Sequence, residues 1–148
     1  MRYALLIPSL VAMASPAFAR EGHVAADAEG IWLNPKHTVA VHTDACGPNS
    51  IQNRSQSLCG QIVWASNQAR ADARDSDVPR LLGTEILEDY RFRGHGTWSG
   101  TVFVPDMGRH FASEIDQLSP TQLRVKGCIL GGLLCKSQVW TRIGQVPA

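Results

Sequence analysis

The fold is decided by a stretch that reads RGHGTWSGTVFVPDMG over residues 93–108. Its middle, residues 97–104, is rich in aromatic and β-branched side chains, which favour a strand. Glycine-rich residues 93–96 precede this run and Pro105-Asp106-Met107-Gly108 follows it, and both compositions are typical of turns. The stretch therefore predicts a strand bounded by two turns, as in an antiparallel sheet.

The same alternation of short strand-like runs and turns extends along the chain from residue 30. Runs predicted as strands lie at residues 30–34, 38–43, 58–64, 83–92, 97–104, 109–115, 122–128 and 136–142. Eight strands is the number at which a closed barrel has room for packed side chains or one small ligand. Residues 67–73 contain helix formers but run into the turn-rich segment 75–79, so we expect a single turn or a loop there. The predicted fold is all-β, a single small antiparallel up-and-down barrel of about eight strands.

The first 19 residues have the composition of an export signal. Arg2 supplies the positive start, residues 4–14 form an apolar stretch, and Ala17-Phe18-Ala19 fits the small-x-small cleavage pattern. The apolar stretch is shorter than the ~20 residues that a membrane-spanning helix needs. The expected organisation is a signal peptide at 1–19, a flexible N-terminal lead at 20–29 and one barrel domain at 30–143.

The charge of the mature chain is balanced. Cleavage removes Arg2 from the 14 basic residues and leaves 13, against 13 acidic residues. Such a balance gives no electrostatic basis for binding nucleic acid or an anionic membrane. We therefore expect no nucleic-acid partner. The export signal predicts a periplasmic or secreted protein with no membrane span after signal cleavage.

Four cysteines occur in a chain that is expected to be exported, where thiols tend to be oxidised. Three pairings are possible in principle. We favour Cys46 with Cys59 and Cys128 with Cys135, because each pair flanks a turn-rich stretch between two predicted strands. The alternative is a zinc site, but the chain has no Cys-x-x-Cys motif and its histidines are scattered. We predict two disulfides, no metal site and no cofactor.

A family resemblance runs along most of the predicted barrel. Its segments are Gly30-Ile31-Trp32, Cys46, LCGQIVW at 58–64, LLG at 81–83, WSGTVFVPD at 98–106 with Gly108, LRVKGC at 123–128 and QVWTR at 138–142. In the order and spacing of these segments the chain resembles the bacterial DUF2147 proteins over residues 28–143. The resemblance implies an exported protein with a lipocalin-like barrel of the calycin group, in a family whose function is largely unassigned.

The resemblance also implies a structural role for three residues near the two ends of the chain. In calycin-like barrels a glycine lets the first strand bend tightly, and the tryptophan two positions later covers the closed end. An arginine from the last strand packs over the indole face, an attraction of roughly 0.5–2 kcal/mol. Gly30, Trp32 and Arg142 occupy these positions. They are predicted to form a structural cap.

An apolar interior is expected from the alternation within the strands, since successive side chains point to opposite faces. The predicted ligand-lining residues are Trp98, Val102, Phe111, Ile86, Tyr90, Val125 and Leu123. An apolar surface with a few polar groups is typical of a small-molecule pocket. It is also typical of an ordinary filled core, so both interpretations stay open.

Catalytic patterns are weak in this sequence. Ser99-Gly100 does not have the Gly-x-Ser-x-Gly pattern of a nucleophile elbow. The acidic residues of segment 72–77 lack the glycine and distal glutamate of an EF-hand loop, and Arg74 and Arg80 nearby are expected to neutralise them. We therefore predict a protein that is not an enzyme and that binds a small apolar or amphipathic molecule in its barrel. The alternative is an envelope interaction module that binds protein or glycan through an outer face or the 65–82 loop.

Overall fold

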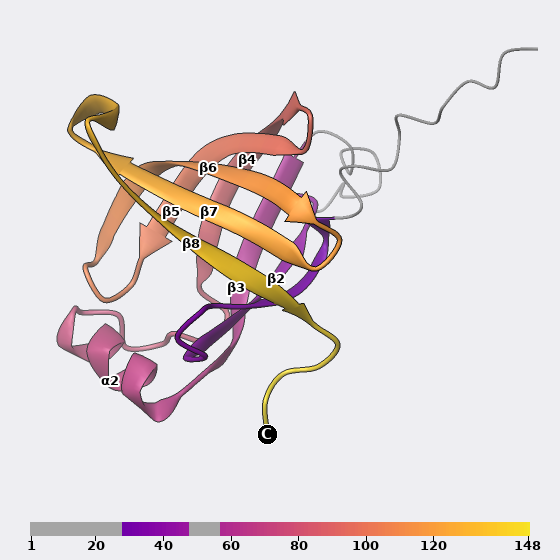
Figure 1. Cartoon of the computed structure of the whole chain (residues 1–148). Coiled ribbons are helices and arrows are strands. Elements are labelled where there is room, and N and C mark those ends of the chain that lie inside the picture. The colour runs from indigo at the N-terminus through magenta and orange to yellow at the C-terminus, as the bar shows by residue number, and fades with distance from the viewer. Residues whose placement is uncertain (1–27, 48–56) are drawn as a thin grey trace, which may run out of the picture.

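A closed barrel of eight antiparallel strands is formed by residues 28–47 and 57–148, which the computed structural model describes. Each strand pairs with its neighbours in the sequence, and the last strand pairs with the first (Figure 1). The strands are β1 (Gly30–Leu33), β2 (Val39–Asp44), β3 (Ser57–Ala65), β4 (Glu85–Gly94), β5 (Thr97–Val104), β6 (Arg109–Ser119), β7 (Gln122–Ile129) and β8 (Leu134–Ile143). The predicted all-β, up-and-down barrel is confirmed.

The connections divide the barrel into two ends. One end carries the short turns at residues 95–96 and 120–121. We call it the Trp32 end, because Arg142, which packs on the Trp32 ring, donates a hydrogen bond to the Pro120 carbonyl there. The other end carries the helix α2 (Asn67–Asp75), the β5–β6 turn and the short 3-10 helix η3 (Leu130–Gly132). We call it the helix end (Figure 1).

The segment that was expected to form a single turn or a loop is instead the nine-residue helix α2. Ser66 caps its start, because the Ser66 hydroxyl accepts a hydrogen bond from the Ala69 backbone N–H at 3.2 Å. Ala73 is buried in the barrel core, and Ala69 packs against it. The prediction was wrong because this tertiary packing and the serine cap stabilise a helix that is too short to form alone.

The β4 strand breaks the simple alternation that the sequence suggested. Asp89 has a φ of 49°, and the register with β5 shifts between Glu88 and Arg91. As a result Leu87 and Tyr90 both belong to the buried core. Leu87, rather than Ile86, is the register partner of Val102 and shares its inward face.

Buried side chains fill the barrel interior at the Trp32 end and in the part next to it. A side chain beside an empty chamber would expose surface to water, and the largest core side chains expose almost none. These side chains are Trp32, Trp98, Tyr90, Leu58, Ile62, Leu87, Ile115 and Leu123. Around these side chains the barrel interior is therefore packed with protein.

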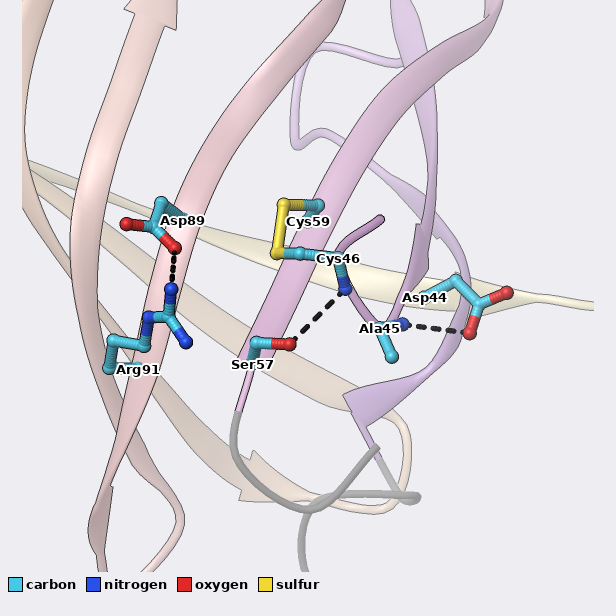
Figure 2. Close-up of a disulfide and its surroundings, with 7 residues drawn as sticks. All are labelled: Asp44, Ala45, Cys46, Ser57, Cys59, Asp89 and Arg91. Atoms are coloured by element: carbon cyan, nitrogen blue, oxygen red, sulfur yellow. Dashed lines mark hydrogen bonds and ion pairs between the residues drawn. A yellow bond between two sulfur atoms is a disulfide. The ribbon is translucent and has the colours of Figure 1, made fainter. Parts of the chain in front are cut away.

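Both predicted disulfides are confirmed. Cys46 and Cys59 are bonded, with their Cα atoms 5.0 Å apart, and join the segment after β2 to β3 (Figure 2). Cys128 and Cys135 are bonded across β7 and β8, where they are register partners. The described residues contain no free cysteine.

The barrel domain begins slightly earlier than expected. The predicted signal peptide and residues 20–27 of the predicted lead lie outside the described residues. Ala28, which the sequence assigned to a flexible lead, is fully buried in the core. Its carbonyl oxygen accepts hydrogen bonds from Trp32 Nε1 at 3.1 Å and from Thr43 Oγ1 at 2.6 Å. Within the described part of the chain, no helix is long and apolar enough to cross a membrane.

Candidate functional site

Trp32 lies fully buried at the end of the barrel that carries its name. Its indole Nε1 donates hydrogen bonds to the Ala28 carbonyl at 3.1 Å and to Thr43 Oγ1 at 3.0 Å. Thr43 is itself fully buried, and its hydroxyl donates to the Ala28 carbonyl. The single indole donor is thus shared between β2 and the segment before β1, and no polar atom of the ring is left for a ligand.

Arg142 covers the other side of the Trp32 ring. Its guanidinium carbon lies 4.2 Å from the ring centroid. The Arg142 Nε donates to the Pro120 carbonyl and its Nη1 donates to the Glu29 carbonyl, both at 2.7 Å. A Cβ atom at Gly30, whose φ is 145°, would overlap the guanidinium group. The three residues assigned to the cap therefore contact one another, and the arginine links β8 to the β6–β7 turn and to the segment before β1.

Two hydroxyl groups lie inside the barrel without a hydrogen-bond partner, Tyr90 Oη and Ser113 Oγ. Both residues are buried. Ser113 is the register partner of Gly100 on β5 and of Gly127 on β7. The Tyr90 ring lies against Gly100, where a Cβ atom would come within 2.7 Å of Tyr90 Cγ. Two glycines thus flank Ser113 in the sheet, and no larger residue fits at Gly100.

The Tyr90 phenol stays neutral over the physiological pH range. Burial raises its pKa above the usual value, and the neighbouring Ser113 hydroxyl opposes part of that rise without forming a hydrogen bond of normal geometry. A neutral phenol can donate one hydrogen bond and accept others. Because buried polar groups in native proteins are nearly always hydrogen-bonded, the Tyr90–Ser113 pair marks a place where a polar group of another molecule would be favourable.

β8 has an open edge, because among the described strands β1 is too short to pair with its residues 134–140. The short β1 pairs only with residues 141–143 of β8. Lys136 and Gln138 are the register partners of Gly127 and Val125, so they belong to the inward face of β8. Both side chains are nevertheless exposed to solvent. The open edge of β8 therefore connects the inward face of the barrel with the surrounding water.

The residues predicted to line a pocket fall into two groups. Trp98, Tyr90 and Leu123 are part of the filled core. Val102 and the half-buried Phe111 are register partners nearer the helix end, whereas Val125 pairs with Ile115, the partner of Trp98. Ile86 is buried in the same core cluster as Leu87, which pairs with Val102. Residues that the sequence did not single out are Gly100, Ser113, Gly127, Lys136 and Gln138.

A cavity of about 170 Å³ lies outside the barrel, between α2 and the segment that follows it. Arginines dominate its lining, which consists of Arg70, Arg74, Pro79, Arg80, Leu81 and Leu82. Arg70 Nε donates to the Ala65 carbonyl at 3.0 Å. The expected neutralisation of acidic segment 72–77 by Arg74 and Arg80 is not seen, because none of the ion pairs within the described residues involves them. Asp72 instead accepts a hydrogen bond from Gln68 at 2.7 Å.

The outer face of β6 and β7 carries two ion pairs. Arg124 lies 2.7 Å from Asp116, and Lys126 lies 3.3 Å from Glu114. Burial would raise the pKa of Asp116, but hydrogen bonds from Arg124 and Thr97 outweigh that effect and hold the pKa below its usual value. Both cations of β7 are thus neutralised. Among the described residues, no group of three His, Cys, Asp or Glu side chains is placed to hold a metal ion.

Comparison with known proteins agrees with this architecture. The family model for uncharacterized proteins conserved in bacteria (DUF2147) matches residues 30–142. Protein HP1028 from the human pathogen Helicobacter pylori, which is described as a member of the lipocalin family, has a similar structure with a TM-score of 0.55. The similarity covers 79% of this chain and 83% of that chain at 13% sequence identity, so it establishes the lipocalin-like fold alone. No curated protein matches the sequence significantly. Because the family model spans nearly the whole barrel, the chain belongs to the DUF2147 family.

Proposed function

We propose that this protein binds a small amphipathic molecule in the part of its barrel that adjoins the open edge of β8. The observation that carries this proposal is the pair of buried hydroxyls, Tyr90 Oη and Ser113 Oγ, that have no hydrogen-bond partner. A buried polar group without a partner costs about 1–3 kcal/mol. A ligand whose polar group bonds to both hydroxyls would recover that free energy.

The surroundings of the two hydroxyls define the chemistry of the proposed ligand. Val102, Val125 and Phe111 supply apolar contacts near Ser113. Lys136 stands at the open edge, and its ammonium group favours a ligand with an anionic group. The filled core beyond Trp98 limits how deep the ligand can lie. These features support a short apolar moiety joined to an acceptor or anionic group.

The same proposal places the protein in the periplasm or outside the cell. Two disulfides in a chain with no free cysteine among its described residues favour an oxidising compartment. The signal-like composition of residues 1–19 supports export of a bacterial protein of this family. Native mass spectrometry of protein purified from its own compartment tests the proposal. A bound small molecule is expected, and a ligand-free mass in every preparation would contradict it.

Replacing Tyr90 by phenylalanine is expected to separate binding from stability. The free energy of unfolding should stay unchanged or rise, because the substitution removes a hydroxyl that is buried without a partner. The affinity for the anionic amphipathic dye anilinonaphthalene sulfonate should fall about fivefold, which corresponds to one lost hydrogen bond. Fluorescence titration and urea denaturation measure the two quantities.

Ser99→Ala is the matched control for this experiment, because Ser99 lies on the opposite face of β5, where it pairs with Glu114. Its dye affinity should equal that of the wild type. If Tyr90→Phe lowers stability and leaves dye affinity unchanged, the phenol has a structural role and the proposed site is wrong.

A second function is favoured by the cavity between α2 and the following segment. Arg70, Arg74 and Arg80 line the same cavity of about 170 Å³, and no ion pair within the described residues neutralises them. Guanidinium groups bind carboxylates and sulfates in bidentate geometry. This arrangement supports binding of an anionic glycan by the 65–82 segment.

The double substitution Arg74→Gln and Arg80→Gln is expected to reduce binding of dextran sulfate about tenfold or more, because two charge-assisted contacts are lost. Surface plasmon resonance at fixed ionic strength measures this affinity. Arg93→Gln, an exposed arginine near the β4–β5 turn, is the control. An equal loss in the control would show that only total charge matters and would remove the cavity as a site.

A further inference from the structure

Large apolar side chains gather, exposed, at the tip of the β7–β8 hairpin. The tip is the segment from Cys128 to Cys135, which reads CILGGLLC. The exposed fractions are 38% for Ile129, 72% for Leu130, 87% for Leu133 and 52% for Leu134. Figure 1 shows that this tip projects beyond the neighbouring strands of the barrel. Contiguous exposed apolar surface of this kind marks an interaction site.

The tip has a defined backbone shape. The Cys128–Cys135 disulfide closes it at its base. Gly131 and Gly132 have φ values of 64° and 94°, which glycine adopts without steric cost. The Leu133 N–H donates to the Leu130 carbonyl at 3.3 Å. Because the hairpin is already ordered, its leucines can be buried in a partner with little further loss of conformational entropy.

The part of the chain that carries the tip has charges of one sign. Residues 117–148 contain no aspartate and no glutamate. Lys136 directly follows the tip, and Arg109 begins β6, the strand next to β7. Neither cation takes part in the ion pairs found among the described residues. Although the whole chain is nearly neutral, the segment with the apolar tip is therefore basic, and Lys136 beside the tip takes part in none of these ion pairs.

We propose that the 128–135 tip inserts into the interface of a bilayer that contains anionic lipids and so holds the protein peripherally on a membrane. The apolar tip followed by cations matches the order of acyl chains and phosphates across a lipid leaflet. A protein partner would need a groove shaped for these four apolar side chains, whereas a fluid leaflet needs only an apolar layer beneath a layer of phosphates. The patch has four apolar residues, fewer than the roughly 20–30 residues that each partner normally contributes to a stable interface.

Cosedimentation of the oxidised protein with vesicles tests the proposal. We expect binding to vesicles of phosphatidylethanolamine and phosphatidylglycerol, and weaker binding to vesicles of phosphatidylcholine alone. The double substitution Leu130→Ser and Leu133→Ser should weaken partitioning about 100-fold, or roughly tenfold for each lost leucine. Lys136→Gln should weaken binding to the anionic vesicles about fivefold and reduce its dependence on salt.

Leu118→Ser is the matched control, because Leu118 is 45% exposed near the β6–β7 turn at the opposite end of the barrel. Its partitioning should equal that of the wild type. The tip variants should also keep the wild-type melting temperature, since the replaced side chains are exposed. Absence of wild-type binding, or an equal loss in Leu118→Ser, would overturn the proposal. Concentration-dependent dimers that Leu130→Ser and Leu133→Ser abolish, without vesicle binding, would identify a self-association surface instead.

Discussion

Replacing Trp32 by alanine is expected to lower the free energy of unfolding by about 3–5 kcal/mol. The ring is fully buried, so its removal forfeits apolar burial and leaves a cavity that its rigid neighbours cannot fill. The substitution also removes the donor to Thr43 Oγ1 and the surface on which the Arg142 guanidinium rests. Urea denaturation monitored by circular dichroism measures the loss, and an unchanged slope would show that the denatured state is the same.

Two further variants separate the contributions to this effect. Trp32→Phe keeps most of the buried aromatic surface but removes the indole donor, so we expect a loss of about 1–2 kcal/mol. Arg142→Lys keeps the charge but cannot reproduce the two hydrogen bonds to the Pro120 and Glu29 carbonyls, and it should also be less stable than the wild type. A loss below about 1 kcal/mol for Trp32→Ala would contradict the assignment of Trp32 as the cap, since large core truncations cost more than that.

The barrel could be predicted from the sequence because its signals are local. Alternation within residues 97–104 and the turn formers on either side need no knowledge of the rest of the chain. The disulfide pairs follow from the same local logic, since each cysteine pair flanks one connection. The α2 helix could not be predicted in this way. Its stability comes from the contact of Ala69 and Ala73 with the core, which no propensity scale includes.

The candidate site was less predictable because it depends on irregularities and on neighbouring strands. The shift in β4 at Asp89 places Leu87 and Tyr90 on one face, which strict alternation forbids. Gly100 and Gly127 give no sequence signal for a binding site, yet they flank Ser113 in the sheet. Their position beside Ser113 can be recognised only when the register of β5, β6 and β7 is known.

The charge around the 128–135 tip shows the same limit of sequence analysis. A balanced total argues against an anionic membrane only if the charges are evenly spread. Arg124 and Lys126 are close to Lys136 in the sequence, but they are neutralised by acidic residues of β6, whereas Lys136 has no ion pair within the described residues. Acidic residues on a neighbouring strand decide which cations are neutralised, and the sequence alone does not show which strands are neighbours.

Replacing both Cys46 and Cys59 by serine is expected to lower the free energy of unfolding by about 3 kcal/mol. The reason is that a disulfide closing a loop of this size reduces the conformational entropy of the unfolded chain. The two cysteines are 13 residues apart in the sequence. In the folded protein the bond joins the segment after β2 to β3, and the Cys46 N–H donates to Ser57 Oγ at 3.3 Å (Figure 2). The free energy of unfolding of the double variant, measured in urea without reductant, gives the loss directly.

The Cys128–Cys135 bond provides an internal comparison for this prediction. It closes a separation of only 7 residues, and its cysteines are already register partners in a hairpin. Its removal should therefore cost less, about 2 kcal/mol on the same entropic relation. Wild-type protein in excess reductant should lose the sum of the two effects, provided that the sites are independent. If the hairpin bond proved to be the more stabilising of the two, loop entropy would not be what these disulfides contribute, and the native contacts around each bond would have to supply the difference.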